Sequence, residues 1–195
     1  MRLLIMGPQG VGKGTQAKLL AKRFGIPHIS TGDVFRANIA EGTSLGVQIK
    51  GLIDAGGLVP DELTDTVVAQ RLAEPDCAGG WILDGYPRTI EQVHALDAML
   101  LGAGHRIDAV VALRADHAEL IKRIHERIAI EGRADDNPAA IERRLSLYDK
   151  ETAPLLNVYK DRGLTVFVNS EDKIEDTQAS IIRHLADYGL DVNAR

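Results

Sequence analysis

Cysteine is almost missing from this sequence, and aromatic residues are few. Cys77 is the only cysteine among 195 residues, so the chain cannot close an internal disulfide. No spacing of cysteine and histidine matches a zinc site, and we expect no structural zinc. His117 and His125 lie on one predicted helix, which we interpret as a solvated face. Because only 4% of residues are aromatic, the core must consist mainly of leucine, isoleucine, valine and alanine.

Long apolar runs and a surplus of basic residues are missing as well. The apolar run before Gly7 is too short for a signal peptide, and no segment approaches the ~20 apolar residues that a membrane span needs. A formal charge of −5 argues against a surface that binds nucleic acid or an anionic membrane. We therefore expect a reduced, cytoplasmic, monomeric protein with one compact domain over residues 1–195.

Short apolar runs alternate with helical patterns along the chain. The strand candidates are residues 3–6, 26–29, 81–83, 107–113 and 164–168. Apolar residues at helical spacing predict a first helix that Gly25 ends, followed by helices over 61–73, 89–101, 116–127, 138–160 and 174–186. Pro154 should kink or divide the long helix. This alternation implies an α/β fold in three layers, with a mostly parallel five-stranded sheet and helices on both faces.

Two segments depart from this alternation. Residues 30–59 predict a helix, a glycine and a second helix without a strand, and residues 128–137 form a short polar link between two helices. Neither segment contains an apolar run that would pack into the sheet. Asn137 and Pro138 resemble an N-cap and a first-turn proline at the end of the link. We expect both segments to be mobile flaps on the central fold.

A glycine-rich string from Gly7 to Thr15 follows the first strand and opens a helix. This context is typical of a phosphate loop, because glycines let successive backbone N–H groups point inward and the helix N-terminus adds partial positive charge. Lys13 supplies a full positive charge. Gly14 follows the lysine, and the hydroxyl comes one residue later, at Thr15. We therefore expect Mg²⁺ to be held more through water and nucleotide oxygens.

A second informative stretch covers residues 81–92. Asp84 ends a strand that we expect beside the phosphate loop, where a carboxylate can orient waters on Mg²⁺. Arg88 emerges from the following turn, where its planar, charged side chain can clamp a phosphate. Gln92 has two interpretations that the pattern leaves open. Thr89 and Gln92 fit a helix capping box, and Gln92 also fits a side chain that reads a base.

These two stretches resemble the signatures of the adenylate kinases, within the nucleoside monophosphate kinase family. The likeness covers residues 1–185 and continues through Ser30 to Asp33, Gly57 to Pro60 and Thr152 to Leu155. It implies a P-loop fold that transfers the γ-phosphoryl group of ATP to AMP, reversibly and with Mg²⁺, to give two ADP in purine nucleotide homeostasis. ATP, AMP and ADP would be the only partners, with no nucleic acid and no membrane.

The resemblance also implies a role for each matching residue. The ATP site would contain Gly10, Val11, Gly12, Lys13, Gly14, Thr15, Arg123, Arg127 and Asp172. The AMP site would contain Thr31, Arg36, Gly57, Leu58, Val59, Gly85, Tyr86, Pro87, Arg88, Gln92, Arg133 and Arg144. The catalytic charges would be Lys13, Arg88, Arg127, Arg133 and Arg144, with Mg²⁺ held near Asp84 through water.

The family pattern further implies an NMP-binding flap over residues 30–59 and a short lid over residues 126–136. The sequence departs from the pattern at Gln9, where proline is common, and at Asp172, which is not the usual side chain there. The link is also far shorter than the lid of long-form members. We expect it to close when phosphates draw the arginines inward.

The sequence disfavours three alternative functions. A UMP or CMP kinase would tend to carry asparagine at position 92, so Gln92 favours AMP. A small GTPase would need an Asn-Lys-x-Asp string for guanine, and the nearest string, at Asn157, has the wrong spacing. A degenerate, non-catalytic homologue is disfavoured because Lys13, Asp84 and Arg88 are all present.

Overall fold

A computed structural model of the chain describes residues 1–131 and 136–190. Within these residues, five strands form one parallel sheet in the order β2-β3-β1-β4-β5. The strands are β1 (Arg2–Met6), β2 (His28–Ser30), β3 (Trp81–Asp84), β4 (Ala109–Arg114) and β5 (Thr165–Asn169). The predicted parallel sheet is confirmed. Strand β1 is central, so the loop that follows it lies between its neighbours β3 and β4.

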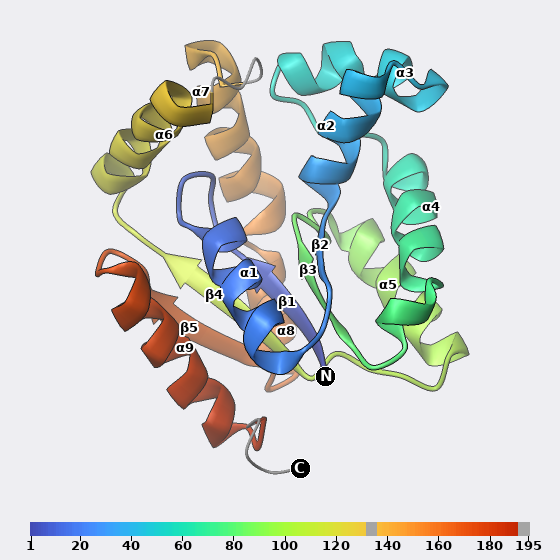
Figure 1. Cartoon of the computed structure of the whole chain (residues 1–195), viewed down its shortest axis with the longest axis vertical. Helices are drawn as coiled ribbons and strands as arrows, with labels where there is room; N and C mark the ends of the chain where they lie inside the picture. Colours follow the sequence, from blue (N-terminus) through green and yellow to red (C-terminus); the bar gives the residue numbers. More distant parts are fainter. Residues whose placement is uncertain (132–135, 191–195) are drawn as a thin grey trace.

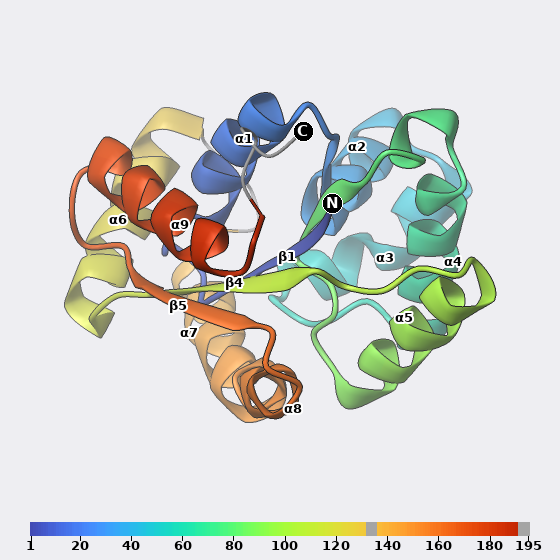
Figure 2. The same cartoon turned by 90° about the horizontal axis from the view of Figure 1, so that it is seen from below.

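Helices cover both faces of this sheet (Figure 2). The helices are α1 (Lys13–Phe24), α2 (Thr31–Glu41), α3 (Ser44–Asp54), α4 (Asp61–Leu72), α5 (Ile90–Gly102), α6 (His117–Glu131), α7 (Pro138–Leu147), α8 (Leu155–Asp161) and α9 (Ile174–Asp187). A 3-10 turn η1 (Pro75–Cys77) and a π-helical turn η2 (Tyr148–Thr152) complete the described elements. Figure 2 shows α1 and α9 on one side of the sheet, and α5 and α8 on the other. None of the helices in the described residues is both long and apolar enough to cross a membrane.

Two hydrophobic clusters fill the space between the sheet and its helices. On one face Leu20 of α1 and Ile181 of α9 pack with strand residues, and on the other Leu96 of α5 and Tyr159 of α8 do so. Because the sheet is covered on both sides, the apolar residues 109–113 of β4 are all buried. A strand buried on both faces reads as a continuous apolar run, which is how this strand stood out in the sequence.

Helices α2 and α3 form a separate pair with a small core of their own. Phe35, Ile49, Ile53 and Val59 make up this third cluster. Figure 1 shows the pair beyond the sheet, across from α6 and α7. The two helices cross closely because α3 has a glycine at the contact: a Cβ on Gly46 would lie 2.0 Å from the Asn38 carbonyl oxygen. The predicted helix–glycine–helix pattern of residues 30–59 is confirmed.

Three boundaries differ from the sequence prediction or refine it. Strand β2 begins at His28 rather than at residue 26, because the Ile26 N–H donates to the Ala21 carbonyl and completes the end of α1. Helix α6 extends to residue 131, so the first part of the predicted link 128–137 is helical; Ile128 packs against the core cluster. The long helix is divided before Leu155, as expected from Pro154.

Candidate active site

The phosphate loop connects β1 to α1 and presents unpaired backbone donors. Gly10 and Gly12 adopt positive φ angles of 85° and 93°, and a Cβ on Gly10 would lie 2.7 Å from the Leu120 carbonyl oxygen. Helix α1 starts at Lys13 with no side-chain cap and no acidic residue in its first turn. The N–H groups at this end are therefore left to an anion, and the helix dipole favours one. The arrangement fits the phosphate groups of a nucleotide.

Lys13 folds back over this loop. Its Nζ donates to the carbonyl oxygens of Gly7 and Pro8, both at 2.9 Å. Burial lowers the pKa of the Lys13 ammonium from 10.5 to about 8; Asp84 opposes this shift, while Arg88 and Arg127 add to it. A desolvated ammonium beside other cations is a strong attractor for phosphate oxygens.

Asp84 and Arg88 are placed by the end of β3 and the turn that follows it. Ile5 of β1 pairs with Asp84 in the sheet, which brings the carboxylate beside the phosphate loop. The Tyr86–Pro87 peptide bond is cis, and the Arg88 Nε donates to the Gly85 carbonyl at 2.8 Å. Burial lowers the pKa of Arg88, Asp84 opposes the shift, and Arg144 and Arg36 lower the pKa further.

Five cations lie close enough to act on the pKa of Lys13 or Arg88, and we describe them as one cluster. Lys13 is affected by Arg88 and Arg127, and Arg88 by Arg36 and Arg144, although the residues come from α1, α2, the turn after β3, α6 and α7. The carboxylates of Asp33, Asp84 and Asp136 offset part of this positive charge. In a chain with a formal charge of −5, a local cluster of this kind is suited to bind a polyanion.

The helical pair α2–α3 contributes the other predicted AMP residues. The buried Thr31 hydroxyl donates to the Gly85 carbonyl at 3.0 Å, which ties the start of α2 to the turn that carries Arg88. Arg36 forms an ion pair with Asp33 on the same helix. Residues 57–59, the Gly57-Leu58-Val59 string, connect α3 to α4, and the Gly57 N–H donates to the Leu52 carbonyl at 2.8 Å.

A cavity of about 230 Å³ lies beside the phosphate loop. Its walls bring together Arg123 and Asp172, which are distant in sequence, with Val11, Gly12 and Thr15. Arg123 Nε donates to the Glu119 carboxylate at 2.7 Å, and its Nη2 donates to the Glu171 carbonyl at 3.3 Å. Two residues predicted for the ATP site, Arg123 and Asp172, thus share one pocket with the phosphate loop.

Asp136 connects α6, α7 and the phosphate loop. Its side chain has no exposed surface; it accepts hydrogen bonds from Arg127 at 2.8 and 2.9 Å, and Arg144 Nη1 lies 3.4 Å away. Gln9 Nε2 donates to the same carboxylate at 2.8 Å. The contact ties the phosphate loop to the carboxylate that holds Arg127. Arg133 lies outside the described residues.

Hydrogen bonds of Gln92 with Thr89, Arg88 and Asp61 bear on its two interpretations. The Thr89 hydroxyl accepts a hydrogen bond from the Gln92 N–H at 3.2 Å, so Thr89 is the N-cap of α5. The Gln92 side chain does not return to Thr89 as a capping box requires. Its Oε1 accepts from the Arg88 N–H at 2.7 Å, and its Nε2 donates to Asp61 at 2.7 Å. Reading of a base by Gln92 stays a prediction.

Sequence reasoning missed Asp61, Asp65 and His28. Asp61 and Asp65 lie four residues apart on one face of α4, and Asp65 accepts from the Tyr86 hydroxyl at 2.6 Å. His28 Nε2 lies 3.5 Å from the Asp84 carboxylate. The spacing of the two α4 carboxylates was a usable signal, but acidic residues in a first helical turn also occur for the helix dipole alone. Nothing local indicated that Asp136 would be buried.

A larger hollow of about 810 Å³ lies between α6 and α7 and contains none of the predicted site residues. His117 and His125 both lie on its wall. Among residues 1–131 and 136–190, no group of three or more histidine, cysteine or acidic side chains is positioned to hold a metal ion. Of the residues that line the hollow, Lys150 is a cation, and none belongs to the cationic cluster around Lys13 and Arg88.

A phosphate loop on the central strand, a carboxylate on the adjacent strand and a cationic cluster between two helical arms define a P-loop phosphotransferase that acts on nucleotides. The adenylate kinase family model matches residues 5–164. Adenylate kinase of Bifidobacterium longum is 57% identical over 185 residues, which cover 95% of this chain and all of that protein. The counterpart in a Nocardioides species is 52% identical, over 95% of this chain and 97% of that protein.

A third relative, the adenylate kinase of Leifsonia xyli, is 49% identical over 96% of this chain and 94% of its own. The chain belongs to the adenylate kinase family. It is an ATP:AMP phosphotransferase that uses Mg-ATP, and ATP, AMP and ADP are its substrates. The predicted activity and fold class are confirmed.

Proposed function

We propose that the two nucleotides bind on opposite sides of the cationic cluster, with their phosphate chains meeting between Lys13 and Arg88. Several residues assigned to ATP line one cavity, namely Val11, Gly12, Thr15, Arg123 and Asp172. Arg127 acts on the charge of Lys13 in the same loop. Asp172 contributes through its position in the cavity beside Thr15 and Arg123. The cavity volume of about 230 Å³ is matched to part of a nucleotide, such as its base.

AMP is assigned to the side where α2, the 57–59 connection and the turn after β3 converge. Thr31 and Arg88 are both bonded to the Gly85 carbonyl, at 3.0 and 2.8 Å, so the phosphate clamp and the AMP arm share one anchor. Gly85, Tyr86 and Pro87 shape that anchor, Arg36 and Arg144 add charge beside Arg88, and Gln92 reads the base. Arg133 keeps its predicted role in the lid.

Catalysis follows from charge and alignment rather than from a general base. The phosphate of AMP is already an anionic nucleophile, so the protein must hold it in line with the γ-phosphoryl group and stabilise the charge that spreads during transfer. Lys13, Arg88, Arg127 and Arg144 supply preorganised positive charge for this purpose, with Arg133 as the fifth member of the set. The burial of Lys13 and Arg88 strengthens their interactions with phosphate oxygens.

Asp84 is the residue proposed to hold Mg²⁺ through water. Its residue is 8% exposed at the end of β3, and a Cβ on Gly14 would lie 3.7 Å from Oδ2, so the carboxylate lies next to the residue that follows the lysine. Bound Mg²⁺ would neutralise charge on the phosphate chain. The Asp84 carboxylate also acts on the charges of both Lys13 and Arg88, since it raises the pKa of each.

Two arms are proposed to exclude water from the transfer. Residues 30–59 form an NMP-binding flap with its own core, the third cluster, which allows it to move as a unit. Residues 126–136 form the short lid, and its described end, Asp136, is bonded to Arg127 of α6. Arg144 Nη2 donates to the Ile53 carbonyl at 3.1 Å, and Asn137 Nδ2 to the Asp54 carbonyl at 3.0 Å, so the flap contacts α7 and its N-cap, directly after the lid. The enzyme would work as a cytoplasmic monomer.

The observation that carries these assignments is the cationic cluster around Asp84. An assay of ADP formation from ATP with a panel of monophosphates tests them. We expect AMP to be preferred by more than about 10²-fold in kcat/KM over UMP and CMP, because a site built to bond one base edge rejects another. The reaction should also require Mg²⁺. Equal turnover of UMP would contradict the AMP-site assignment while leaving the phosphate loop assignment intact.

A further inference from the structure

The first residue of α4, Asp61, is bonded through its side chain to two groups at the start of α5. Asp61 Oδ1 accepts a hydrogen bond from Gln92 Nε2 at 2.7 Å, and Oδ2 accepts from the Thr89 hydroxyl at 2.8 Å. The Gln92 Oε1, on the other side of the amide, accepts from the Arg88 N–H at 2.7 Å. The Gln92 amide is therefore held between one carboxylate and one backbone N–H.

These two neighbours allow only one orientation of the amide. An ionised carboxylate is an acceptor only, and a backbone N–H is a donor only. Turning the amide over would place Oε1 against the Asp61 carboxylate and Nε2 against the Arg88 N–H, which breaks both bonds and brings like partial charges together. Gln92 is only 2% exposed, so water cannot replace the lost bonds.

The fixed orientation leaves a defined pair of groups on the amide. Gln92 keeps one N–H on Nε2 and one lone pair on Oε1 beyond the bonds to Asp61 and Arg88. This donor and acceptor complement the Watson–Crick edge of adenine, which offers an acceptor at N1 and a donor at the 6-amino group. A 6-oxopurine has the opposite pattern, with a donor at N1 and an acceptor at O6.

We propose that Asp61 is a positioning residue that sets the choice of AMP over 6-oxopurine monophosphates, by fixing the orientation of the Gln92 amide. The inference rests on the proposed base-reading role of Gln92 and assigns the origin of its discrimination to a residue that does not contact the base. The carboxylate is one of two groups that fix the amide. An amide at position 61 can turn to suit either orientation of Gln92 and would leave the Arg88 N–H as the one remaining constraint, whereas a carboxylate cannot turn in this way.

The surroundings of Asp61 keep it in place. Asp65, one turn later on α4, accepts from the Tyr86 hydroxyl at 2.6 Å, and that hydroxyl also lies 3.2 Å from the Gln92 carbonyl oxygen. The N-terminal half of α4 is thus bonded at two points to the segment between Tyr86 and Gln92. Asp61 lies on α4 and Gln92 on α5, and these two helices pack against each other. The position of Asp61 relative to Gln92 is therefore fixed by helix packing rather than by a loop.

The test compares AMP with inosine monophosphate, whose base differs from adenine at N1 and position 6 only. We would measure kcat/KM for both in the wild type, Asp61→Asn, Gln92→Ala and the double variant. We expect Asp61→Asn and Gln92→Ala each to lower the AMP-to-IMP ratio by about 10-fold or more. The double variant should show no further loss beyond Gln92→Ala, because Asp61 acts through Gln92.

Two controls accompany these variants. Glu62→Gln removes a charge from the same helical turn at an exposed position, and the ratio should not change. Asp61→Glu retains an acceptor-only group and should keep the ratio within about threefold of the wild type. Melting temperatures of all variants would be recorded to show any loss of stability. The ratio of kcat/KM between two substrates is a separate readout, because it does not depend on how much protein is folded.

The outcomes separate this inference from the base-reading role. If Gln92→Ala lowers the ratio and Asp61→Asn does not, base reading stands and the role of Asp61 is refuted. If Gln92→Ala leaves the ratio unchanged, Gln92 does not read the base and both claims fall. If Asp61→Asn lowers kcat/KM equally for the two substrates, Asp61 merely supports the fold, and the inference is wrong.

Discussion

Thr31 and Gly85 meet at a contact that admits no larger residue. The Thr31 hydroxyl donates to the Gly85 carbonyl at 3.0 Å, and a Cβ on Gly85 would lie 2.8 Å from Thr31 Oγ1 and 3.0 Å from Arg88 Nη2. Gly85 also has a φ of 83°, a region that residues with a Cβ rarely adopt. Through this contact Thr31, the first residue of α2, and Arg88 are held by the same peptide.

Gly85→Ala should therefore impair AMP use more than ATP use. The added methyl group must push away Thr31 or Arg88, and its backbone strain costs on the order of 1–3 kcal/mol. We expect KM for AMP to rise and kcat to fall by about 10-fold or more, with a smaller change in KM for ATP. Steady-state kinetics with each substrate varied in turn would measure this. Gly102→Ala, at a helical position where a Cβ meets nothing within 4 Å, serves as the control.

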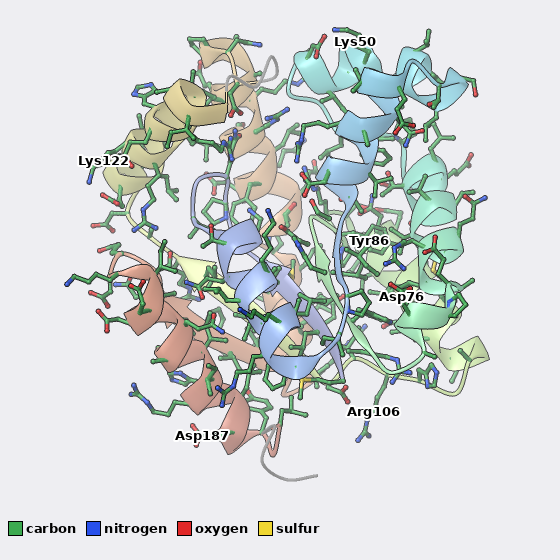
Figure 3. The ribbon with its side chains drawn as sticks, viewed as in Figure 1. Lys50, Asp76, Tyr86, Arg106, Lys122 and Asp187 are labelled. Atoms are coloured by element: carbon green, nitrogen blue, oxygen red, sulfur yellow. The ribbon has the colours of Figure 1, made fainter. Side chains whose placement is uncertain are left out.

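Lys13→Ala and Arg88→Ala should each reduce kcat by about 10²-fold or more while the fold survives, because each removes preorganised charge from the transferring group. Circular dichroism would verify folding and a coupled assay would measure kcat. Two exposed cations provide matched controls. Lys18 lies on α1, and Arg106 extends into solvent at the end of the molecule away from α2 and α3 (Figure 3). An Arg88→Ala enzyme with near-normal kcat would remove Arg88 from the catalytic set.

Lys13 should make stability depend on pH in a specific direction. Its pKa is about 8 in the folded state, and we take the ordinary lysine value of 10.5 for the unfolded chain. Between these two pH values the unfolded state therefore binds more protons than the folded state. Stability then rises with pH through this window, because the cost of a buried charge is relieved as the ammonium loses its proton. Lys13→Met should be more stable than the wild type at pH 7, and the difference should shrink between about pH 8 and 10.5.

Chemical denaturation of both proteins across this pH range would measure the difference, with Lys18→Met as the exposed control. Activity has the opposite dependence. kcat/KM for ATP, which reports the free enzyme, should fall above about pH 8 as Lys13 loses its charge, while kcat should persist to higher pH because bound phosphates favour the ammonium. A stability difference that stays constant with pH would show that Lys13 does not titrate in this range.

Asp136 should be essential for the stability of the unliganded enzyme. It is buried between Arg127, Arg144 and Gln9, so Asp136→Ala leaves the two guanidinium groups without their shared carboxylate. We expect a loss of roughly 3–5 kcal/mol in the free energy of unfolding, as for other broken buried pairs. Saturating nucleotide should recover part of this loss, because phosphate oxygens replace the carboxylate.

Denaturant unfolding with and without ATP and AMP would test this prediction. Asp33→Ala removes a carboxylate from the exposed ion pair with Arg36, and it should cost no more than about 1 kcal/mol. If Asp136→Ala lowers the free energy of unfolding no more than this control does, the Asp136 contacts do not stabilise this part of the enzyme.

Much of the architecture could be predicted because its causes are local. The predicted N-cap at Asn137 is confirmed: its side chain accepts from the Ala140 N–H at 2.9 Å, with Pro138 as the first helical residue. The boundary error at β2 arose because residues 26–29 form an apolar run. Pattern alone does not show that Ile26 belongs to the end of α1, where its N–H bonds to the Ala21 carbonyl.

The sequence by itself determined the phosphate loop and the Asp84–Arg88 turn, because all their parts are contiguous and their shape follows from glycine, proline and the start of a helix. Tertiary structure decided which distant groups complete the site. Gln9 meets Asp136 across 127 positions, and Gln92 meets Asp61 across 31. Such contacts depend on how the helices pack over the sheet, and no periodicity or local hydrogen-bond preference specifies which polar side chains that packing brings together.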